Sequence, residues 1–242
     1  MIRIASYNIW AAGDFPYTLQ TGKERRDPAP FARFLQDEDV DICCLNEVRD
    51  YRPSDGRCQA DEIARLAGLG YVHFTCALKL DGYRYGNALV SRYPMRILRE
   101  IPLVLPETRR SPTVYYEDRA LTVVEIDAPD GVLTVAFCHF GLSSEDGNLA
   151  VSEILPIAKS VRTPFILAGD FNLEPSEKPY ALLSSVLRDT AAGYGYLTFP
   201  SNAPEKKIDY IFVNDRLRVL DCRVPNVWYS DHRPIVADVE TI

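Results

Sequence analysis

The sequence predicts an α/β sandwich in which two packed β-sheets are flanked by helices. Many short apolar runs of strand character occur along the chain, with few amphipathic helical segments between them. The connections between strands include a tight hairpin and longer crossovers that contain a helix. No glycine-rich phosphate loop follows any strand, so a doubly wound nucleotide-binding fold is not indicated.

The bulk composition is that of an ordinary globular protein. The chain has 242 residues, of which 47% are hydrophobic and 25% are charged. It contains no linker, internal repeat or low-complexity run that would divide it. We therefore expect a single domain over residues 1–242.

The first half of the chain is expected to contain strands that end in polar side chains, with helices between them. The run 2–9 is a strand ending at Asn8, and the run 41–45 is a buried strand ending on Glu47. A helix begins at the prolines 28 and 30, because apolar residues then recur at helical spacing. The remaining expected segments are a loop at 10–27, a loop at 49–57, a helix over 60–67, a strand over 71–78 and a loop at 80–85.

The second half is expected to be richer in strands. The turn Pro129-Asp130-Gly131 joins two of them as a hairpin, which places Arg119 and His139 on adjacent antiparallel strands. A third helix contains Pro156, which is expected to kink or break it. The expected elements are strands at 97–105, 119–127 and 132–140, a helix over 151–158, a strand at 165–170, a short helix at 180–184, and strands at 208–213, 217–224 and 235–239.

The stretch 165–172 places two polar residues at the end of a buried strand. Its apolar residues lead into Gly169, which allows the chain to turn or to approach a neighbour closely. Asp170 and Asn172 are two residues apart, so an extended backbone would direct both side chains to one side. An Asx turn that caps the following helix would use the same residue types. This stretch alone leaves both interpretations open.

Two of the three histidines lie at expected strand ends beside polar groups. These are His139 and His232, whereas His73 lies inside a strand and is expected to be structural. His232 could exchange a proton with water or with a leaving group if a carboxylate oriented it. Asp209, at the start of a neighbouring strand, is the expected partner; the alternative is a strand-edge charge that blocks aggregation.

Polar residues thus stand at the ends of more strands than stability alone would explain. Carboxylates and carboxamides without thiolates suit a hard cation such as Mg²⁺ or Mn²⁺. With two histidines and Arg119, such a cation would fit attack of water on a phosphorus centre. The strand-end residues are Asn8, Glu47, His139, Asp170, Asn172, Asp209, Asp231 and His232.

Eight short motifs follow one another along nearly the whole chain. They are Ser6-Tyr7-Asn8-Ile9, Asn46-Glu47-Val48, the run 86–94 beginning Gly86-Asn87, Cys138-His139-Phe140-Gly141-Leu142, Gly169-Asp170-Phe171-Asn172, Leu197-Thr198-Phe199-Pro200, Ile208-Asp209-Tyr210-Ile211 and Ser230-Asp231-His232-Arg233-Pro234. In this order they resemble the endonuclease/exonuclease/phosphatase superfamily. That group includes pancreatic-type deoxyribonucleases, apurinic endonucleases, sphingomyelinases and inositol-polyphosphate 5-phosphatases.

The resemblance implies a four-layer α/β sandwich with two central mixed sheets flanked by helices. It also implies a Mg²⁺-dependent phosphoesterase, in which Mn²⁺ is expected to substitute. Glu47 would be the principal metal ligand, with Asn8 beside it and Asp231 close by. Asp170 would position or deprotonate the attacking water.

The remaining roles implied by the resemblance concern the phosphate and the second histidine. Asn172 and His139 would contact the scissile phosphate, and Arg119 is a further expected phosphate contact. His232, oriented by Asp209, would be the other catalytic histidine. The resemblance leaves open which group is the general base.

The chain departs from the family pattern at two places. Asn46 stands where the family usually has Gln, and little effect is expected because its role would be hydrogen bonding near the site. Trp10 and Asn87 stand where nuclease branches often carry a second acidic residue. The residues at positions 10 and 87 put a nuclease-type second metal position in doubt.

The substrate is not fixed by these patterns. The loop at 80–85 contains Tyr83, Arg84 and Tyr85, which could stack a base or hold a phosphate, although the loop could equally be a solvated hairpin tip. Asn87 is a further expected contact of the phosphate or substrate. The net charge of −7 and the pI near 5.1 provide no general basic field for nucleic acid. We therefore favour a small or lipid-type phosphoester over DNA or RNA, with an endonuclease or exonuclease as the alternative.

An alternative of another class is a catalytically inactive domain that binds a phosphorylated ligand. That alternative predicts loss of a histidine or of the metal-binding glutamate, and neither is lost. Specificity is expected to reside in the loops 10–27, 49–57, 80–85 and 106–118, whose conformations the sequence does not determine.

Cysteine use and hydrophobicity predict the cellular context. The six cysteines are scattered without metal-binding spacing, which predicts free thiols in a reducing compartment. The N-terminus resembles no export signal, and no apolar run approaches membrane-spanning length. We expect a cytoplasmic monomer without a membrane span.

Overall fold

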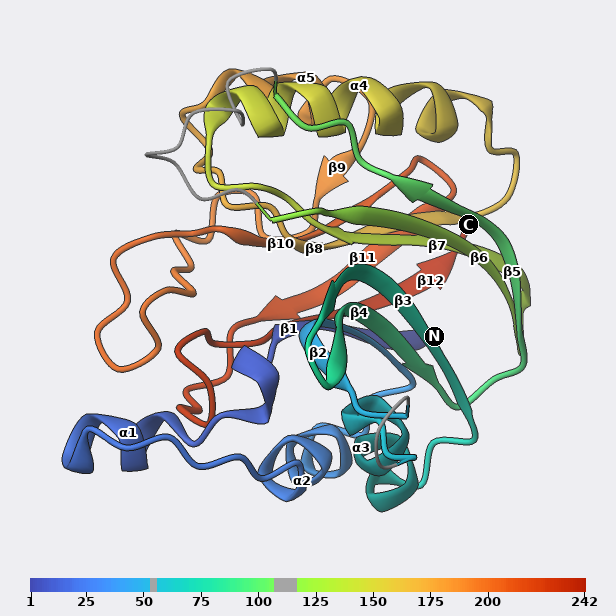
Figure 1. Ribbon diagram of the computed structural model, residues 1–242. Helices are drawn as coiled ribbons and strands as arrows, with labels where there is room; N and C mark the ends of the chain where they lie inside the picture. The colour runs from blue at the N-terminus through green and yellow to red at the C-terminus, as the bar shows by residue number, and fades with distance from the viewer. Residues whose placement is uncertain (53–55, 107–116) are drawn as a thin grey trace.

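The computed structural model describes residues 1–52, 56–106 and 117–242, and in them two six-stranded mixed sheets pack face to face. Helices cover the outer faces of both sheets, so the layers run helix, sheet, sheet, helix (Figure 1). The predicted α/β sandwich is confirmed.

The first sheet has the strand order β11-β12-β1-β2-β4-β3. In it, β1 pairs in parallel with β2 and antiparallel with β12. Its strands are β1 (Ile2–Asn8), β2 (Ile42–Asp50), β3 (Tyr71–Leu80), β4 (Tyr83–Ser91), β11 (Leu217–Arg223) and β12 (Ile235–Thr241).

The second sheet has the strand order β5-β6-β7-β8-β10-β9. Here β7 and β8 are parallel, while β6 and β10 run antiparallel to their neighbours. Its strands are β5 (Met95–Pro102), β6 (Ala120–Ala128), β7 (Gly131–His139), β8 (Phe165–Asp170), β9 (Arg188–Asp189) and β10 (Asp209–Val213). The expected hairpin between β6 and β7 is present, with Ala128 paired to Gly131.

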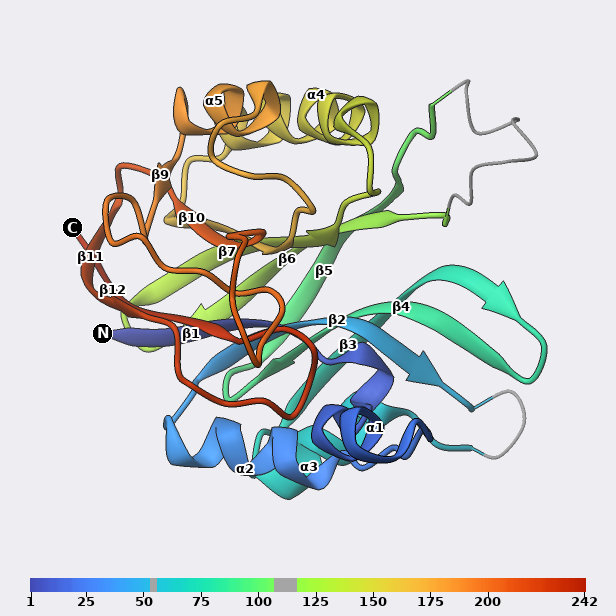
Figure 2. The same ribbon diagram turned by 90° about the vertical axis from the view of Figure 1, so that its left-hand side faces the viewer.

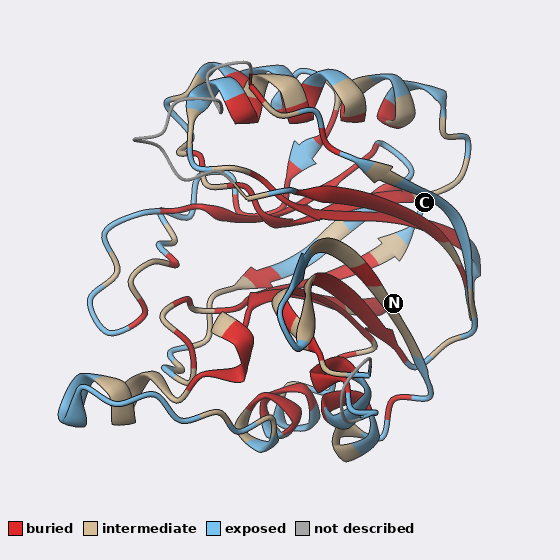
Figure 3. Ribbon diagram, viewed as in Figure 1, coloured by how far each residue is buried: buried red, intermediate tan, exposed pale blue. Residues whose placement is uncertain are grey.

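Apolar side chains fill three layers of core. One cluster lies between the sheets, a second between the first sheet and α2 (Ala29–Asp37) and α3 (Gln59–Ala67), and a third beneath α4 (Ser144–Ser160) and α5 (Lys178–Ser184). Figure 2 shows α2 and α3 on one outside of the sandwich and α4 and α5 on the other. Buried residues follow the central strands and the inner faces of the helices (Figure 3). None of the helices in the described residues combines the length and the apolar character required to cross a membrane.

The segment 10–27 contains more regular structure than the expected loop. A short 3₁₀ turn, η1 (Trp10–Ala12), precedes the helix α1 (Phe15–Thr21). The Asp14 side chain caps α1 by accepting a hydrogen bond from the Tyr17 backbone N–H, and Gly22 ends the helix in the left-handed conformation. These capping residues were the sequence signals for a helix that lacks a buried apolar face.

Strand β2 continues through the residues where the sequence analysis ended it. Its pairing with β4 is irregular between Leu45 and Val48, and Glu47 has a φ of 60°. This is the geometry of a bulge, which adds a residue to one strand and redirects its side chain. The prediction that the strand stops at Glu47 was therefore wrong, because the chain turns Glu47 aside and then resumes pairing.

Two other local predictions need correction. Helix α4 runs unbroken through Pro156, whose exposed position leaves the freed carbonyl group accessible to water. Tyr83 and Arg84 belong to β4 rather than to a loop, since only two residues connect β3 to β4. The expected loop 106–118 lies largely outside the described residues.

Candidate active site

The ends of strands from both sheets bring the candidate residues together. In the second sheet, His139 is the register partner of Asp170, and Asp170 is the register partner of Asp209. In the first sheet, Asn8 is paired with Asn46 across the parallel strands β1 and β2. Because parallel strands end at the same edge, two polar rows face each other there.

Gly169 allows β8 to lie close to β7 just before Asp170. A Cβ atom at this position would lie 1.9 Å from the carbonyl oxygen of Cys138. Any side chain here would push the two strands apart. The glycine therefore maintains the close packing that sets Asp170 beside His139.

Asn46 connects the two sheets. Its Nδ2 donates to Asn87 Oδ1 at 2.9 Å and to the Cys138 carbonyl oxygen at 3.1 Å, and its Oδ1 accepts from the backbone N–H of Asp170 at 2.9 Å. Asn46 is fully buried. The expected hydrogen bonding near the site is thus a set of three bonds, two of which cross from one sheet to the other.

Asp170 lies at the centre of the cluster with 1% of its surface exposed. Its Oδ2 is 3.0 Å from Asn8 Nδ2, 3.3 Å from His139 Nε2 and 3.7 Å from His232 Nε2. Burial favours the protonated acid, but the two histidines and the amide of Asn8 outweigh burial and hold the pKa of Asp170 below its usual range. Asp170 is therefore an ionised carboxylate in a dry environment.

Asn172 does not continue the extended strand. Its φ is 47°, and its backbone N–H donates to Asp170 Oδ1 at 2.9 Å, which is an Asx turn. The period-two argument for one shared direction was wrong, yet both side chains reach His139, with Asn172 Nδ2 at 3.0 Å from His139 Nε2. The Asx turn and the polar site, which the sequence left as alternatives, are therefore both present in this stretch.

His232 forms the second histidine centre. Its Nδ1 lies 2.9 Å from Asp209 Oδ2, and its ring packs against Phe199 with the ring centroids 4.8 Å apart. Burial disfavours the charged imidazole, but Asp209 and Asp170 outweigh burial and raise the pKa of His232 to about 10. The second oxygen of Asp209 is buried and has no hydrogen-bond partner.

Glu47, Asn8 and Asp231 form the acidic side of the cluster. Asn8 Nδ2 donates to Glu47 Oε1 at 2.9 Å. Burial raises the pKa of Asp231 to about 6, and Glu47 adds to the rise against the opposite effect of His232. A buried carboxylate whose proton affinity is raised further by a neighbouring carboxylate is an electrostatic setting that a divalent cation relieves. This oxygen-rich set fits a hard cation.

A second group could also supply metal ligands. Asp170, Asp209 and His232 place one ligand atom each within 4.8 Å of one another. Two of these residues are already joined by the hydrogen bond between Asp209 and His232. The ligand atoms of this second group are therefore partly engaged with one another.

Arg119 and Asn87 lie beside the cluster, while Tyr83 and Arg84 do not. Arg119 Nη1 is 2.9 Å from His139 Nδ1, and Asn87 is buried against Asn46. Tyr83 packs on Tyr51 and beneath Arg49, and Arg84 pairs with the buried Asp50. The structure does not bring Tyr83 or Arg84 to the site, since their side chains contact Tyr51, Arg49 and Asp50 instead.

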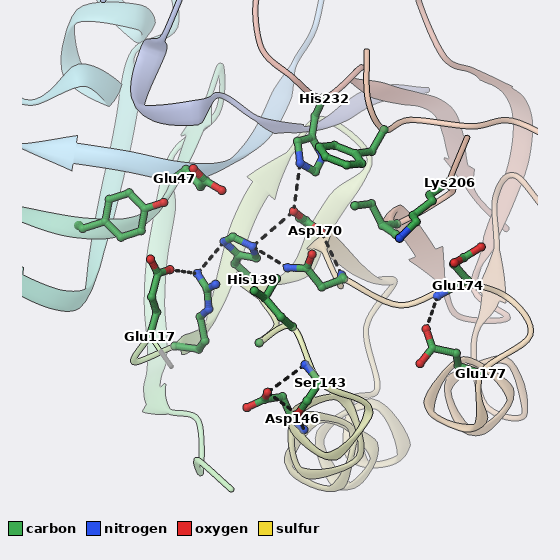
Figure 4. A pocket seen from close by; sticks show the side chains of 17 residues that line it. Glu47, Glu117, His139, Ser143, Asp146, Asp170, Glu174, Glu177, Lys206 and His232 are labelled. Carbon is green, nitrogen blue, oxygen red and sulfur yellow. Dashed lines mark hydrogen bonds and ion pairs between the residues drawn. The ribbon is translucent and has the colours of Figure 1, made fainter. Parts of the chain in front are cut away.

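The cluster opens into a cavity of about 730 Å³ (Figure 4). Glu47, Arg119, His139, Asp170, Asn172 and His232 all line it. The rest of its wall comprises Tyr85, Glu117, Gly141, Leu142, Ser143, Asp146, Glu174, Glu177, Phe199, Lys206 and Ile208. Gly141, Leu142, Phe199 and Ile208 belong to motifs named in the sequence analysis, and Tyr85 belongs to the segment 80–85 that it considered for substrate binding. The other six residues belong to no motif, so only the proximity of several to the motifs at 138–142, 169–172 and 197–200 could have indicated them.

Comparison with known families decides the relationship. Residues 5–232 match the family described as Endonuclease/Exonuclease/phosphatase. The chain belongs to this family. The superfamily resemblance predicted from the eight motifs is therefore confirmed, and its members include phosphatases and nucleases.

Solved structures of family members share the fold at low sequence identity. An endonuclease/exonuclease/phosphatase protein from Beutenbergia cavernae is 23% identical with a TM-score of 0.77, covering 99% of this chain and 71% of that one. A mannosyl-6-phosphatase from Bacteroides thetaiotaomicron is 20% identical with a TM-score of 0.73, covering 99% and 100%. The catalytic domain of human nocturnin, with bound sulfate, is 19% identical with a TM-score of 0.69, covering 100% and 93%. A comparison with curated protein sequences gave no significant match.

Proposed function

We propose that this family member is a Mg²⁺-dependent phosphoesterase that hydrolyses a phosphoester by attack of water on phosphorus. The observation that carries the proposal is the convergence of His139, Asp170 and His232 with Glu47 on one cavity. Family members are mostly hydrolases of phosphoesters, which supports the same reaction class. Asp170 lies within 3.7 Å of both histidines, so proton-transfer groups and phosphate-binding groups surround one small volume.

Glu47 and Asp231 would hold the cation, and Mn²⁺ is expected to replace Mg²⁺. Asn8 would hold Glu47 in place or, with its amide turned, offer its own oxygen. A bound divalent cation would supply charge neutralisation for the phosphoryl oxygens. The oxygen ligands and the raised pKa of Asp231 support this assignment.

The two proton-transfer groups are in opposite states. Asp170 has a lowered pKa and is ionised, so it can accept a hydrogen bond from the attacking water and take its proton. His232 has a pKa of about 10 and carries its proton at neutral pH, so it can stabilise the transition-state charge or protonate the leaving group. Asp209 keeps the His232 ring oriented. We therefore assign the base to Asp170 and the acid to His232.

The cavity wall favours a small substrate. Six carboxylates line the cavity, from Glu47, Glu117, Asp146, Asp170, Glu174 and Glu177, against the fixed cations Arg119 and Lys206. A polyanion such as nucleic acid would meet repulsion over most of this wall. Lys206 and Glu174 lie together at the outer end (Figure 4), where they could contact hydroxyl groups of an uncharged leaving group. The structurally similar mannosyl-6-phosphatase supports a sugar phosphate as one candidate.

The test is hydrolysis of p-nitrophenyl phosphate, bis(p-nitrophenyl) phosphate, hexose phosphates and a single-stranded oligonucleotide. Each is assayed with Mg²⁺, with Mn²⁺ and with EDTA, for the natural sequence, His232→Ala and the control His73→Ala. We expect metal-dependent turnover that survives in His73→Ala and is lost in His232→Ala. Cleavage of the oligonucleotide alone would replace the proposed substrate class by a nuclease, and binding of phosphorylated ligands without turnover would leave an inactive binding domain.

We further propose that the protein acts as a monomer in the cytoplasm. All six cysteines are unpaired, and five of them are buried with pKa values raised above the ordinary thiol value, namely Cys43, Cys44, Cys58, Cys138 and Cys222. Free thiols support a reducing compartment. Light scattering would test the monomer, and fractionation of cells would test the compartment.

A further inference from the structure

Arg119 contacts the ring of His139 on the side away from the centre of the cluster. It is the residue just before β6, and the pairing of Leu121 with Cys138 sets it beside the end of β7. Its Nη1 lies 2.9 Å from His139 Nδ1 and 3.0 Å from Glu117 Oε2. Only 8% of Arg119 is exposed, and the ion pair with Glu117 holds the guanidinium group in this place.

This contact determines the protonation of His139. A guanidinium group carries only hydrogen-bond donors and does not lose its proton in proteins. His139 Nδ1 must therefore accept the hydrogen bond and cannot carry a hydrogen of its own. An imidazole with a bare Nδ1 is neutral, with its single proton on Nε2.

The opposite edge of the ring faces the cluster. His139 Nε2 lies 3.3 Å from Asp170 Oδ2 and 3.0 Å from Asn172 Nδ2. Asn172 Nδ2 is also a donor and already bonds the Phe140 carbonyl oxygen at 3.1 Å. The Nε2–H of His139 and the Nδ2–H of Asn172 are both donors, so neither can accept a hydrogen bond from the other. Side by side, they can both donate to one anionic oxygen.

We propose that Arg119, held by Glu117, is a positioning residue that keeps His139 neutral with its proton on Nε2. In this form His139 acts with Asn172 as a pair of donors to one phosphoryl oxygen, and His139 takes no part in proton transfer. The phosphate-binding role rests on the proposed phosphoesterase function, whereas the protonation state follows from the Arg119 contact alone. Arg119 thereby differs from the direct phosphate contact expected from the sequence.

The charges around the ring favour the same state. On the Nδ1 side stands the Arg119 cation with Glu117 behind it, and a proton added to Nδ1 would bring two positive donors together. Asp170 lies on the Nε2 side, and a neutral His139 can still donate a hydrogen bond to it from Nε2. The charge of His232, on the far side of Asp170, and the hydrogen bonds from His139 and Asn8 together favour the ionised form of this carboxylate.

The test is long-range ¹H–¹⁵N NMR of the histidine rings in the full ¹⁵N-labelled chain without substrate. The chain has three histidines, so His73→Gln and His139→Gln assign the signals. We expect His139 to show a proton on Nε2 and none on Nδ1 when the spectrum is recorded at about pH 8. A signal for the Nδ1–H form, or for the imidazolium, would overturn the proposal whether or not the protein hydrolyses phosphoesters.

Arg119→Gln supplies the complementary result. A glutamine carbonyl can accept from Nδ1–H, so the Nδ1–H form of His139 should appear in the spectrum, and kcat should fall at least 10-fold. Arg119→Lys retains a donor and should keep the neutral ring. Arg218→Gln, an exposed arginine on β11 paired with Glu240, is the matched control and should leave the ring signals unchanged. An unchanged His139 tautomer in Arg119→Gln, with the fold intact by thermal unfolding, would show that another group sets the position of the proton.

Discussion

The side-chain oxygen of Asn46 accepts a 2.9 Å hydrogen bond from the backbone N–H of Asp170, although the two residues belong to different sheets. Asn46 directly precedes Glu47 in the chain. One buried amide therefore ties the residue assigned to the cation to the residue assigned to the attacking water. The distance between these two functions is set by how the sheets pack, not by any single loop.

Asn46→Ala is expected to reduce both stability and turnover. It leaves the Asp170 N–H, the Cys138 carbonyl and the Asn87 side chain without this partner, which should lower the free energy of unfolding by about 2–4 kcal/mol. Turnover should fall by about 10²-fold, because Asp170 is no longer fixed relative to Glu47. Urea unfolding and steady-state kinetics measure the two effects.

Asn214→Ala is the matched control for this variant. Asn214 bonds the Phe165 N–H and the Thr163 carbonyl at the opposite end of β8. It should lower stability by a similar amount while leaving kcat unchanged. Equal losses of turnover in the two variants would mean that Asn46 acts only through stability.

The Asp209–His232 pair should make stability depend on pH in the alkaline range. The pKa of His232 is raised from 6.5 to about 10, so the protonated ring stabilises the folded state fully below pH 6.5, and this contribution is lost as the pH rises toward 10. Asp209→Asn removes the largest cause of the rise and should flatten the decline between pH 7 and 10. Urea unfolding across this range tests it, and parallel curves for the two proteins would contradict the assignment.

Hydrolysis should require both members of the proton-transfer pair. Asp170→Asn and His232→Ala should each lower kcat by at least ~10² while the circular dichroism spectrum is retained, which is the usual scale for loss of acid–base assistance. If a variant kept the turnover of the natural sequence, the role assigned to the replaced residue would be wrong.

Mg²⁺ should stabilise the protein at pH 8 and lose this effect at pH 5. The pKa of Asp231 is raised to about 6, so protons compete with the cation as the pH falls through that value. Glu47→Gln and Asp231→Asn should raise the Mg²⁺ concentration needed for the thermal shift. Asp221→Asn, an exposed residue on β11, is the control, and an identical metal titration for Glu47→Gln would remove Glu47 from the metal site.

Arg84→Ala should affect stability more than catalysis. Arg84 and Arg52 together hold the pKa of the buried Asp50 below its usual range against the opposing effect of burial, so loss of Arg84 weakens the charge balance there. The melting temperature should fall, while KM for small phosphoesters stays unchanged. A raised KM would instead support the substrate contact that the sequence predicted for Arg84.

Most of the strands and their polar ends could be predicted because local signals encode them. Apolar runs that terminate in Asp170 or Asn8 reveal both the strand and its functional end. The bulge at Glu47 could not be predicted in this way, since its left-handed backbone depends on pairing with β4. Much of the outer cavity wall could not be predicted for the same reason. Lys206 and Glu174 line one cavity because of tertiary packing, which no periodic pattern in the sequence encodes.

The excess of carboxylates along the cavity has a kinetic consequence. An incoming phosphate dianion meets a repulsive potential until a divalent cation has occupied the Glu47 side, so the two should bind in a compulsory order with the cation first. Released inorganic phosphate would then have little affinity for the cation-free protein. Product inhibition should accordingly weaken when free Mg²⁺ is scarce, so that the cation concentration governs both the entry of substrate and the retention of product.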